Sequence, residues 1–429
     1  MKKCILAVLM LVFSVFCFTF SSCIQLGENK GIGTSNYKME DGENFIDSRA
    51  WVKYNAGKYN EYLGFIDTTG KILYSETLEN QKTYNIGKGS GLIVTEETCK
   101  LINAKGEIVL TIDEKTEIKA YGGGYAWVYQ NKSTITDLEH LYGVIDYQGN
   151  WVKPLVNLEE DDLYDKIKHI GNGFVGEIGR KDIVYPIYKG DNSIAITLNG
   201  VFSDWHAEFS NGMAFIPLSC HVRFASMKNG ISITVTKRNE DGESVTEVYE
   251  NIKDNCIIYE DGRVVNIGFS VAQLDYDWAF YDGKVVTREN EQYLGITDYT
   301  QTTPITTQFT AYPASRIEDF TFNGDYGLVQ IRGLDEEKYV TMIDTQGNEL
   351  IEPIKGKEVD DFILAPDGYA YYKQDDYYYI IDKNGNSMKT DITWFVKFSE
   401  NIGVVKDDWY VLYYIKPNGE KLFDKLTAQ

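Results

Sequence analysis

Histidine is the side chain best suited to acid–base chemistry near neutral pH, and this chain has only four. The stretch Ser203-Asp204-Trp205-His206 brings a nucleophile, an acid and a base close together. On a strand, however, Asp204 and His206 would share one face while Ser203 would point to the other. A hydrolase of the Gly-x-Ser-x-Gly type needs a sharp turn at its serine, and the chain contains no such motif. We therefore predict no catalytic triad.

The remaining histidines offer no set of metal ligands. They occur as the pair Glu139-His140, the pair Cys220-His221 and the single His169. Structural zinc sites use four Cys or His side chains at short, regular spacings, and none of these histidines has such neighbours in sequence. We predict that the chain binds no metal and no cofactor.

Carboxylates are abundant and leave one enzymatic alternative open. Acidic clusters occur at residues 159–162, 358–361 and 375–376, and such clusters are typical of solvated turns. Residues 239–243 approach a calcium loop but lack the alternating oxygen ligands at its start. Glycoside hydrolysis needs two carboxyl groups that the fold, not the sequence, brings together. We predict a non-enzymatic protein, with a glycan hydrolase that uses paired carboxylates as the alternative.

Three cysteines beyond the N-terminal region have an undetermined state. Cys99, Cys220 and Cys256 are far apart, without a Cys-x-x-Cys motif. One disulfide among them is possible, but its connectivity does not follow from the sequence. Buried free thiols that act as small apolar side chains are the interpretation we prefer.

Aromatic side chains are the material best suited to binding. The chain has 32 Tyr, 20 Phe and 7 Trp, and several gather near the C-terminus, at residues 371–372, 377–379, 409–410 and 413–414. Alternation along a strand would turn half of each group outward, where a ring offers area and a hydroxyl offers a polar tip to sugars or peptides. We expect most of them to form core and cross-strand pairs, with an exposed binding surface as the alternative.

A repeated hairpin must position these residues. In the stretch from Tyr142 to Pro154, Val144 and Ile145 favour a strand. Asp146 can accept a hydrogen bond from the backbone two residues further on, and Gly149 can adopt a positive φ at no steric cost. The sequence therefore predicts a strand, a tight turn and a second strand.

The same turn recurs along the chain. Its clearest copies have the turn residues Asp67 and Gly70, Asp146 and Gly149, Asp344 and Gly347, and Asp382 and Gly385. Weaker copies end at Gly106 and Gly419, and one copy has Gln301 at the glycine position. Neighbouring turn glycines lie 34 to 43 residues apart. A period near forty residues with several strands per unit is typical of a β-repeat array.

A second element recurs upstream of the turn. It consists of a glycine or asparagine, one spacer, an alanine or glycine, and then a strand. Its copies begin at Gly124, Gly212, Gly368 and Asn401. Residues 180–262 match the repeat poorly.

These motifs resemble the WG-repeat family. The resemblance rests on Leu63-Gly64-Phe65-Ile66-Asp67, Tyr142-Gly143-Val144-Ile145-Asp146, Phe209-Ser210-Asn211-Gly212-Met213-Ala214 and Phe398-Ser399-Glu400-Asn401-Ile402-Gly403. It covers most of residues 47–429, with Leu63 or Tyr142 where the family often has Trp. The resemblance implies an all-β repeat fold and a binding role, and it implies no defined reaction.

The N-terminal segment predicts a lipoprotein signal. Lys2 and Lys3 precede an uncharged apolar run that stops at Ser21-Ser22-Cys23, as in a bacterial lipobox. On this interpretation residues 1–23 are the signal peptide, and Cys23 carries the acyl chains that hold the protein on the outer side of the bacterial cell membrane. Lipid chains contribute about 0.8 kcal/mol per buried CH₂. An ordinary signal peptide or an uncleaved anchor helix is the alternative.

Two further boundaries follow from composition. Residues 24–45 are rich in Gly, Asn and Ser and predict a flexible tether. Residues 46–429 predict an all-β domain of eight to ten units, β-propeller-like, with an open β-solenoid of hairpins as the alternative. A ring is preferred because it leaves no long free strand edges. Asn157 to Ile170 is the one segment with helical spacing, and an acidic loop is equally compatible.

Charge restricts the class of partner. The formal net charge is −22, from 64 acidic and 42 basic residues. This balance excludes nucleic acid and opposes docking on anionic lipid. The sequence predicts an extracytoplasmic, lipid-anchored module that binds a protein, a peptide or a glycan.

Overall fold

The structure is a computed structural model. It describes residues 37–427 except 57–59, 133–138, 158–166, 178–183, 200–208, 210–211, 217–230, 240–241, 253–255, 268–279, 282, 289–293, 302 and 424.

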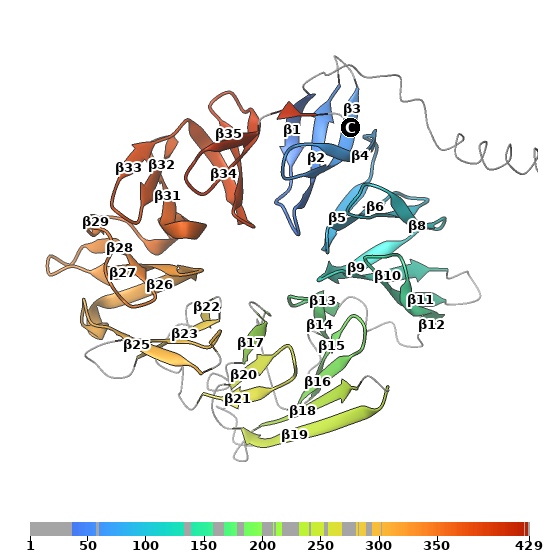
Figure 1. The fold of residues 1–429 in the computed structure, drawn as a ribbon, viewed down its shortest axis with the longest axis horizontal. Coiled ribbons are helices and arrows are strands. Elements are labelled where there is room, and N and C mark those ends of the chain that lie inside the picture. Colours follow the sequence, from blue (N-terminus) through green and yellow to red (C-terminus); the bar gives the residue numbers. More distant parts are fainter. Residues whose placement is uncertain are drawn as a thin grey trace, which may run out of the picture.

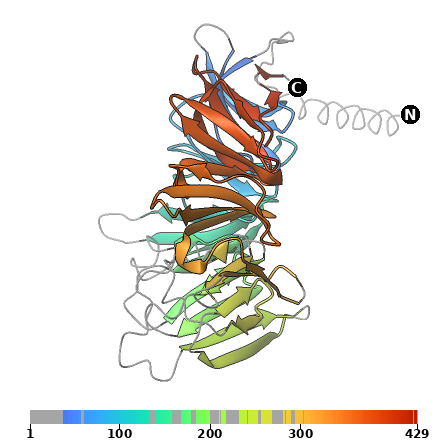
Figure 2. The same cartoon turned by 90° about the vertical axis from the view of Figure 1, so that its left-hand side faces the viewer.

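The described residues form nine small antiparallel sheets. Figure 1 shows them as blades arranged in a ring around one axis, and Figure 2 shows the same ring from the side as a flat disc. The protein is an all-β, nine-bladed β-propeller, which confirms the preferred architecture and excludes the open solenoid. Helical structure in the described residues is limited to three short 3₁₀ turns: η4 (Ala314–Arg316), η5 (Val359–Asp361) and η6 (Pro366–Gly368).

The first three blades are simple meanders of four strands. Blade 1 contains β1 (Tyr37–Gly42), β2 (Arg49–Asn55), β3 (Glu61–Asp67) and β4 (Ile72–Thr77). Blade 2 contains β5 (Lys82–Gly87), β6 (Ser90–Val94), β7 (Cys99–Ile102) and β8 (Ile108–Ile112). Blade 3 contains β9 (Glu117–Gly122), β10 (Tyr125–Asn131), β11 (His140–Asp146) and β12 (Trp151–Asn157).

Two strands that lie in sequence within blade 5 belong to the sheet of blade 4. Blade 4 contains β13 (Ile167–His169), β14 (Phe174–Glu177), β15 (Val184–Lys189) and β16 (Ile194–Asn199). Its outer edge is extended by the hairpin of β18 (Ile231–Arg238) and β19 (Ser244–Ile252), because β16 pairs with β18. This hairpin lies in sequence within blade 5, between β17 (Met213–Ile216) and the strands β20 (Cys256–Tyr259) and β21 (Val264–Asn266). This hairpin accounts for residues 231–252 of the segment 180–262 that matches the repeat poorly.

Blades 6 to 9 return to the four-strand meander. Blade 6 contains β22 (Phe280–Tyr281), β23 (Lys284–Arg288), β24 (Leu294–Asp298) and β25 (Ile305–Phe309). Blade 7 contains β26 (Ile317–Asn323), β27 (Tyr326–Arg332), β28 (Lys338–Asp344) and β29 (Ile354–Lys355). Blade 8 contains β30 (Phe362–Ala365), β31 (Tyr369–Gln374), β32 (Tyr377–Asp382) and β33 (Ser387–Lys389). Blade 9 contains β34 (Ile392–Ser399), β35 (Ile402–Asp407), β36 (Leu412–Ile415) and β37 (Lys421–Phe423).

The C-terminal residues close the ring on blade 1. Strand β38 (Lys425–Leu426) pairs with β1. The next residue, Thr427, donates its N–H to the carbonyl of Gly70 and accepts from the N–H of Ile72, each at 3.0 Å. Leu426 is completely buried in the core shared by blades 9 and 1. Closure therefore joins the two ends of the array by backbone hydrogen bonds and by apolar burial.

The repeated turn connects the third and fourth strands of a blade. Its aspartate side chain accepts two backbone N–H groups, as Asp67 does from Thr69 at 2.9 Å and from Lys71 at 3.1 Å. Asp146, Asp344 and Asp382 make the same pair of bonds. Gly70, Gly149, Gly347 and Gly385 have φ between 76° and 89°, a left-handed conformation that glycine adopts without strain. These eight residues lie where the hairpin pattern places them.

The second repeated element begins the second strand of a blade. Ala126, Ala214 and Ala370 are completely buried there. At the matching position in β35, a Cβ on Gly403 would come within 2.9 Å of the Phe398 ring. A small residue at this position leaves room for a nearby side chain, which at Gly403 is the Phe398 ring of the same blade. The cores lie between blades, as where Ile86 and Leu92 of blade 2 meet residues of β10.

Two expectations need correction. The tether does not reach residue 45, because Tyr37, Met39 and Phe45 are buried in the core of blades 9 and 1. The propeller therefore includes residues 37–45, which the predicted boundary at residue 46 left out. A helix ending near Ile170 is also wrong for the described residues, since β13 occupies residues 167–169 and β12 ends at Asn157.

Residues 1–36, with Cys23, lie outside the described part of the chain. Within the described part, no helix has both the length and the apolar character needed to cross a bilayer.

Candidate functional site

A cleft of about 350 Å³ lies between blade 1 and blade 2. This volume is at the small end of the range for ligand pockets in proteins. Its polar lining consists of Asp41, Glu43, Lys53, Gln81, Lys82 and Thr83. Its apolar lining consists of Trp51, Val52, Leu63 and Tyr84. The cleft thus combines aromatic and aliphatic surface with donors and acceptors of both charges.

A β-bulge in β1 shapes one wall of the cleft. Met39 lies opposite Tyr54 and Asp41 lies opposite Lys53, so Glu40 is the extra residue. Bulges of this kind redirect the side chains that follow them. Beyond the bulge, Asp41 lies near the end of β1, and Glu43 follows the strand end and donates its backbone N–H to the carbonyl of Trp51 at 2.9 Å. The Lys53 ammonium lies 3.9 Å from the Asp41 carboxylate at the cleft mouth.

Glu43 is the carboxylate most affected by its surroundings. It accepts a hydrogen bond of 2.8 Å from the Thr83 hydroxyl of blade 2. Glu43 is exposed as a residue, and it lines the cleft. Burial raises the pKa of Glu43 and Asp41 adds to the increase, while the bond to Thr83 and the charge of Lys53 oppose it. Glu43 therefore takes up a proton at a higher pH than an ordinary glutamate does.

Trp51 forms the floor. Its side chain is almost completely buried, and its indole N–H donates to the carbonyl of Tyr84 at 3.4 Å. A Cβ on Gly91 of blade 2 would come within 2.8 Å of the Trp51 ring, so this blade interface requires glycine there. Tyr84 also meets Tyr121 of blade 3 edge to face, with ring centroids 5.1 Å apart. Tyr84 thus contacts both the floor in blade 1 and Tyr121 in blade 3.

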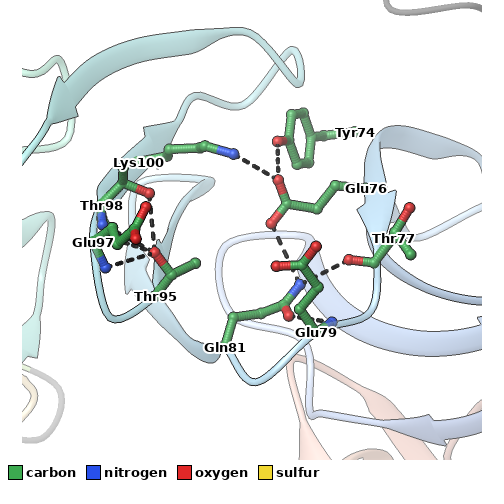
Figure 3. A network of polar contacts seen from close by, with 9 residues as sticks. All are labelled: Tyr74, Glu76, Thr77, Glu79, Gln81, Thr95, Glu97, Thr98 and Lys100. Carbon is green, nitrogen blue, oxygen red and sulfur yellow. Dashed lines mark hydrogen bonds and ion pairs between the residues drawn. The ribbon is translucent and has the colours of Figure 1, made fainter.

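A polar network continues from the cleft into the junction between the two blades (Figure 3). Gln81, which lines the cleft, donates to a carboxylate oxygen of Glu76 at 3.4 Å and to the carbonyl of Thr77 at 3.2 Å. Glu76 also accepts from the Tyr74 hydroxyl at 2.7 Å and pairs with Lys100 of blade 2 at 2.8 Å. The Lys100 and Glu76 side chains are 28% and 20% exposed. This network holds the two walls of the cleft at a fixed separation.

Among the described residues, the histidines singled out for chemistry do not come together. The stretch 203–206 and the pair Cys220-His221 lie outside the described residues. The Nδ1 atom of His140 bonds to the Tyr129 hydroxyl at 2.6 Å, and the two rings stack. His169 accepts from the N–H of Gly173 at 3.1 Å, and burial lowers its pKa to about 4. In the described part of the chain, no group of three potential metal ligands occurs.

The cysteines and acidic clusters that are described serve the fold. Cys99 and Cys256 are free, buried thiols whose pKa burial raises to about 12. Glu358 and Asp361 cap η5 by bonding reciprocally to each other's backbone N–H groups. Asn239 bonds to Gly242 and Glu243 in the turn between β18 and β19.

Four of the nine aromatic residues in the C-terminal groups are core, and residues 377–379 are half-buried. Tyr371, Tyr372, Tyr413 and Tyr414 are all at most 9% exposed, which agrees with the expected core pairs. Trp409 and Tyr410 are different, because they are 79% and 80% exposed.

The cleft is the feature that sequence reasoning missed. Its polar residues come from two blades, and Glu43 and Thr83 are 40 positions apart in sequence. The bulge that exposes Asp41 has no signal in the sequence. The two carboxylates at i and i+2 in Asp41-Gly42-Glu43 were the one local sign.

Comparison with known proteins identifies no family. No family model matches the chain and no curated protein is similar to it in sequence. Among solved structures, Kluyveromyces lactis Hsv2 is 11% identical, with a TM-score of 0.26, over 89% of this chain and 98% of that one. A prolyl endopeptidase is 10% identical, with a TM-score of 0.29, over 91% of this chain and 57% of that one. A Bacteroides caccae protein of unknown function is 10% identical, with a TM-score of 0.24, over 75% of this chain and 93% of that one. Similarities of this size give no information about a ligand.

Proposed function

We propose that this protein is an extracytoplasmic lipoprotein, anchored through acyl chains on Cys23, that binds a short glycan segment without chemically changing it. The cleft between blades 1 and 2 is the binding site. The observation that carries the proposal is the composition of this cleft, in which the half-buried Tyr84 ring lies among carboxylates, ammonium groups, an amide and a hydroxyl.

Sugar hydroxyls both donate and accept hydrogen bonds, and sugar rings present apolar faces to aromatic side chains. Asp41 and Glu43 supply acceptors, Lys53 and Lys82 supply donors, and the opposite charges leave the site close to neutral. A peptide of strong charge would gain less from this lining. The resemblance to WG repeats also favours a binding role.

The test is binding of the chain from residue 24 onward to an array of envelope glycans, followed by titration calorimetry with the best ligand. Glu43→Gln removes a charged acceptor while keeping the size of the side chain, and we expect affinity to fall about tenfold or more. Glu61→Gln, on an exposed strand end outside the cleft, is the matched control and should bind as the wild type does. Equal affinity of Glu43→Gln and wild type would show that the cleft is not the site.

One observation favours glycan hydrolysis as the second candidate. Asp41 and Glu43 face the same cleft, and the pKa of Glu43 is raised, as a general acid requires. An assay for newly formed reducing ends, with the glycan that binds best, distinguishes the two functions. Turnover by wild type that Glu43→Gln abolishes while still binding the glycan would establish the enzyme. No turnover together with tight binding supports the binding module.

A further inference from the structure

The turn between β35 and β36 is a variant of the repeated aspartate turn. Asp407 accepts the backbone N–H groups of Trp409 and Val411, each at 2.9 Å. The N–H of Tyr410 donates to the carbonyl of Asp407 at 3.0 Å. This is the hydrogen-bond pattern of the glycine turns, formed at the opposite end of the blade.

Tyr410 occupies the glycine position of this turn. Its φ is 58°, in the left-handed region that is unfavourable for a residue with a Cβ. Packing does not compensate for the strain, because the side chain is 80% exposed. Strained backbone that packing does not explain is typical of functional sites.

Trp409 stands beside Tyr410 at the tip and is 79% exposed. Trp394 of β34 is a third aromatic residue near this turn. It lies opposite Lys406 of β35, which precedes the turn and in turn lies opposite Leu412 of β36, which follows it. Trp394 is 44% exposed, and the Lys406 ammonium lies 4.8 Å from its ring centroid. The three aromatic residues define what we name the aromatic tip: Trp394, Trp409 and Tyr410.

The aromatic tip lies at the end of the blades from which the N-terminal segment departs. Blade 9 adjoins blade 1 (Figure 1), and their first turns touch, since Ser399 donates to the carbonyl of Phe45 at 2.6 Å and the N–H of Ser48 donates to Glu400 at 2.7 Å. The first turns of blades 9 and 1 lie on one face of the ring, so the strand ends away from these turns lie together on the other face. In blade 9 this end holds residues 407–411, and in blade 1 it holds Tyr37, the first residue of β1.

We infer that the aromatic tip inserts into the headgroup zone of the bilayer that carries the lipid anchor. The inference rests on the anchor in the proposed function. The 13 residues between Cys23 and Tyr37 reach about 50 Å at most, so Tyr37 and the face on which it lies can come no further than that from the anchor. Trp and Tyr concentrate at membrane–water interfaces, where an apolar ring meets a polar environment.

The shape of the tip favours a bilayer over a sugar or a folded partner. Two adjacent rings at the apex of a tight turn form a convex projection, and such a projection cannot surround a ligand but can enter a soft interface. Asp408 precedes Trp409 in the same turn and is itself exposed. Because a carboxylate does not enter hydrocarbon, insertion stops in the headgroup zone. The net charge of −22 makes an uncharged lipid surface the favoured one.

The test uses the full lipidated chain in phosphatidylcholine vesicles that contain lipids brominated near the headgroup. The difference in fluorescence between wild type and Trp409→Phe isolates the emission of Trp409. We expect this component to shift to the blue and to be quenched by the brominated lipids at least twofold. In anionic phosphatidylglycerol vesicles at low salt the quenching should be weaker, and added salt should restore it.

Tyr410→Gly separates a membrane role from a structural one. The substitution relieves the left-handed strain, so we expect the urea midpoint to rise while the quenching of Trp409 falls. Lower stability together with unchanged quenching would assign the tip a structural role and contradict the inference.

A Cys23→Ser variant tests the anchor separately. Release of Cys23→Ser from membranes, with wild type retained, supports the anchor. If wild type is retained but Trp409 stays unquenched, the inference is wrong and the anchor stands. If wild type is not retained, the proposed anchoring is wrong and the inference falls with it. If an added glycan or protein, and not lipid, protects the fluorescence of Trp409 from quenching, the result also contradicts the proposed membrane insertion.

Discussion

Two glycines in equivalent turns offer a matched test of what the repeated turn requires. Gly106 in blade 2 has φ of +86°, and Gly385 in blade 8 has φ of +81°. A Cβ added to Gly385 meets no atom within 4 Å, whereas a Cβ on Gly106 would lie 2.1 Å from the carbonyl oxygen of Leu73 in blade 1. Alanine at either position carries the same backbone strain, but only Gly106→Ala also forces two blades apart.

The expected losses differ for this reason. A residue with a Cβ in the left-handed region costs about 1–2 kcal/mol, which is the whole effect that we expect for Gly385→Ala. Gly106→Ala carries the same cost plus that of moving backbone at a packed interface, so we expect a total of about 3–5 kcal/mol, in the range of severe core substitutions. Gly385→Asn should lose less than Gly385→Ala, because asparagine tolerates a positive φ better.

Urea unfolding followed by tryptophan fluorescence gives the comparison, with the slope of the transition monitored so that midpoints can be compared. The reasoning would be refuted if the two alanine variants lost equal stability. It would also be refuted if Gly385→Ala lost none, since the turn would then not need its left-handed residue.

Three further outcomes follow from the structure. The pKa of His169 is about 4 in the folded protein, against the ordinary histidine value of 6.5 that we expect in the unfolded chain. Between these two pH values protons bind preferentially to the unfolded chain, so the free energy of unfolding should fall by up to about 3 kcal/mol as the pH drops from 6.5 to 4. His169→Gln should remove that part of the pH dependence of the urea midpoint. Cys99 and Cys256 should resist iodoacetamide at pH 8 until urea exposes them, because burial keeps both thiols protonated. If peptide mapping finds either cysteine modified in the native protein, the result would contradict their burial. Lys100→Met should lower the free energy of unfolding by about 1–2 kcal/mol, because it leaves the partly buried Glu76 carboxylate without its cation. An unchanged urea midpoint would show that the network does not hold blades 1 and 2 together.

The parts of the fold that follow from the sequence are the local ones. A turn such as Asp382 to Gly385 forms within five residues, so its side-chain chemistry and its φ can be inferred from residue types. The repeat period then indicates how many blades to expect. Pairings between distant strands leave no local pattern in the sequence. The hairpin of β18 and β19 that joins blade 4 is the clearest case, since its partner β16 lies more than thirty residues earlier.

The start of the domain and the cleft were missed for related reasons. Residues 37–45 look polar and charged in sequence, but the alternation of Tyr37 and Met39 is enough to bury one face once blade 9 packs on it. The cleft requires a bulge at Glu40 and a hydroxyl from the next blade. Neither is visible until the ring has closed.

The distance between the two ends of the array tests the closed ring most directly. Spin labels at Glu61→Cys in blade 1 and Asp408→Cys in blade 9, two exposed positions, can be measured by double electron–electron resonance in the chain from residue 24 onward with Cys220→Ser. Packed sheets lie about 10 Å apart, so a closed ring predicts a single narrow distribution below about 40 Å. A distribution near 80 Å, as eight such spacings in an open stack would give, would contradict the propeller.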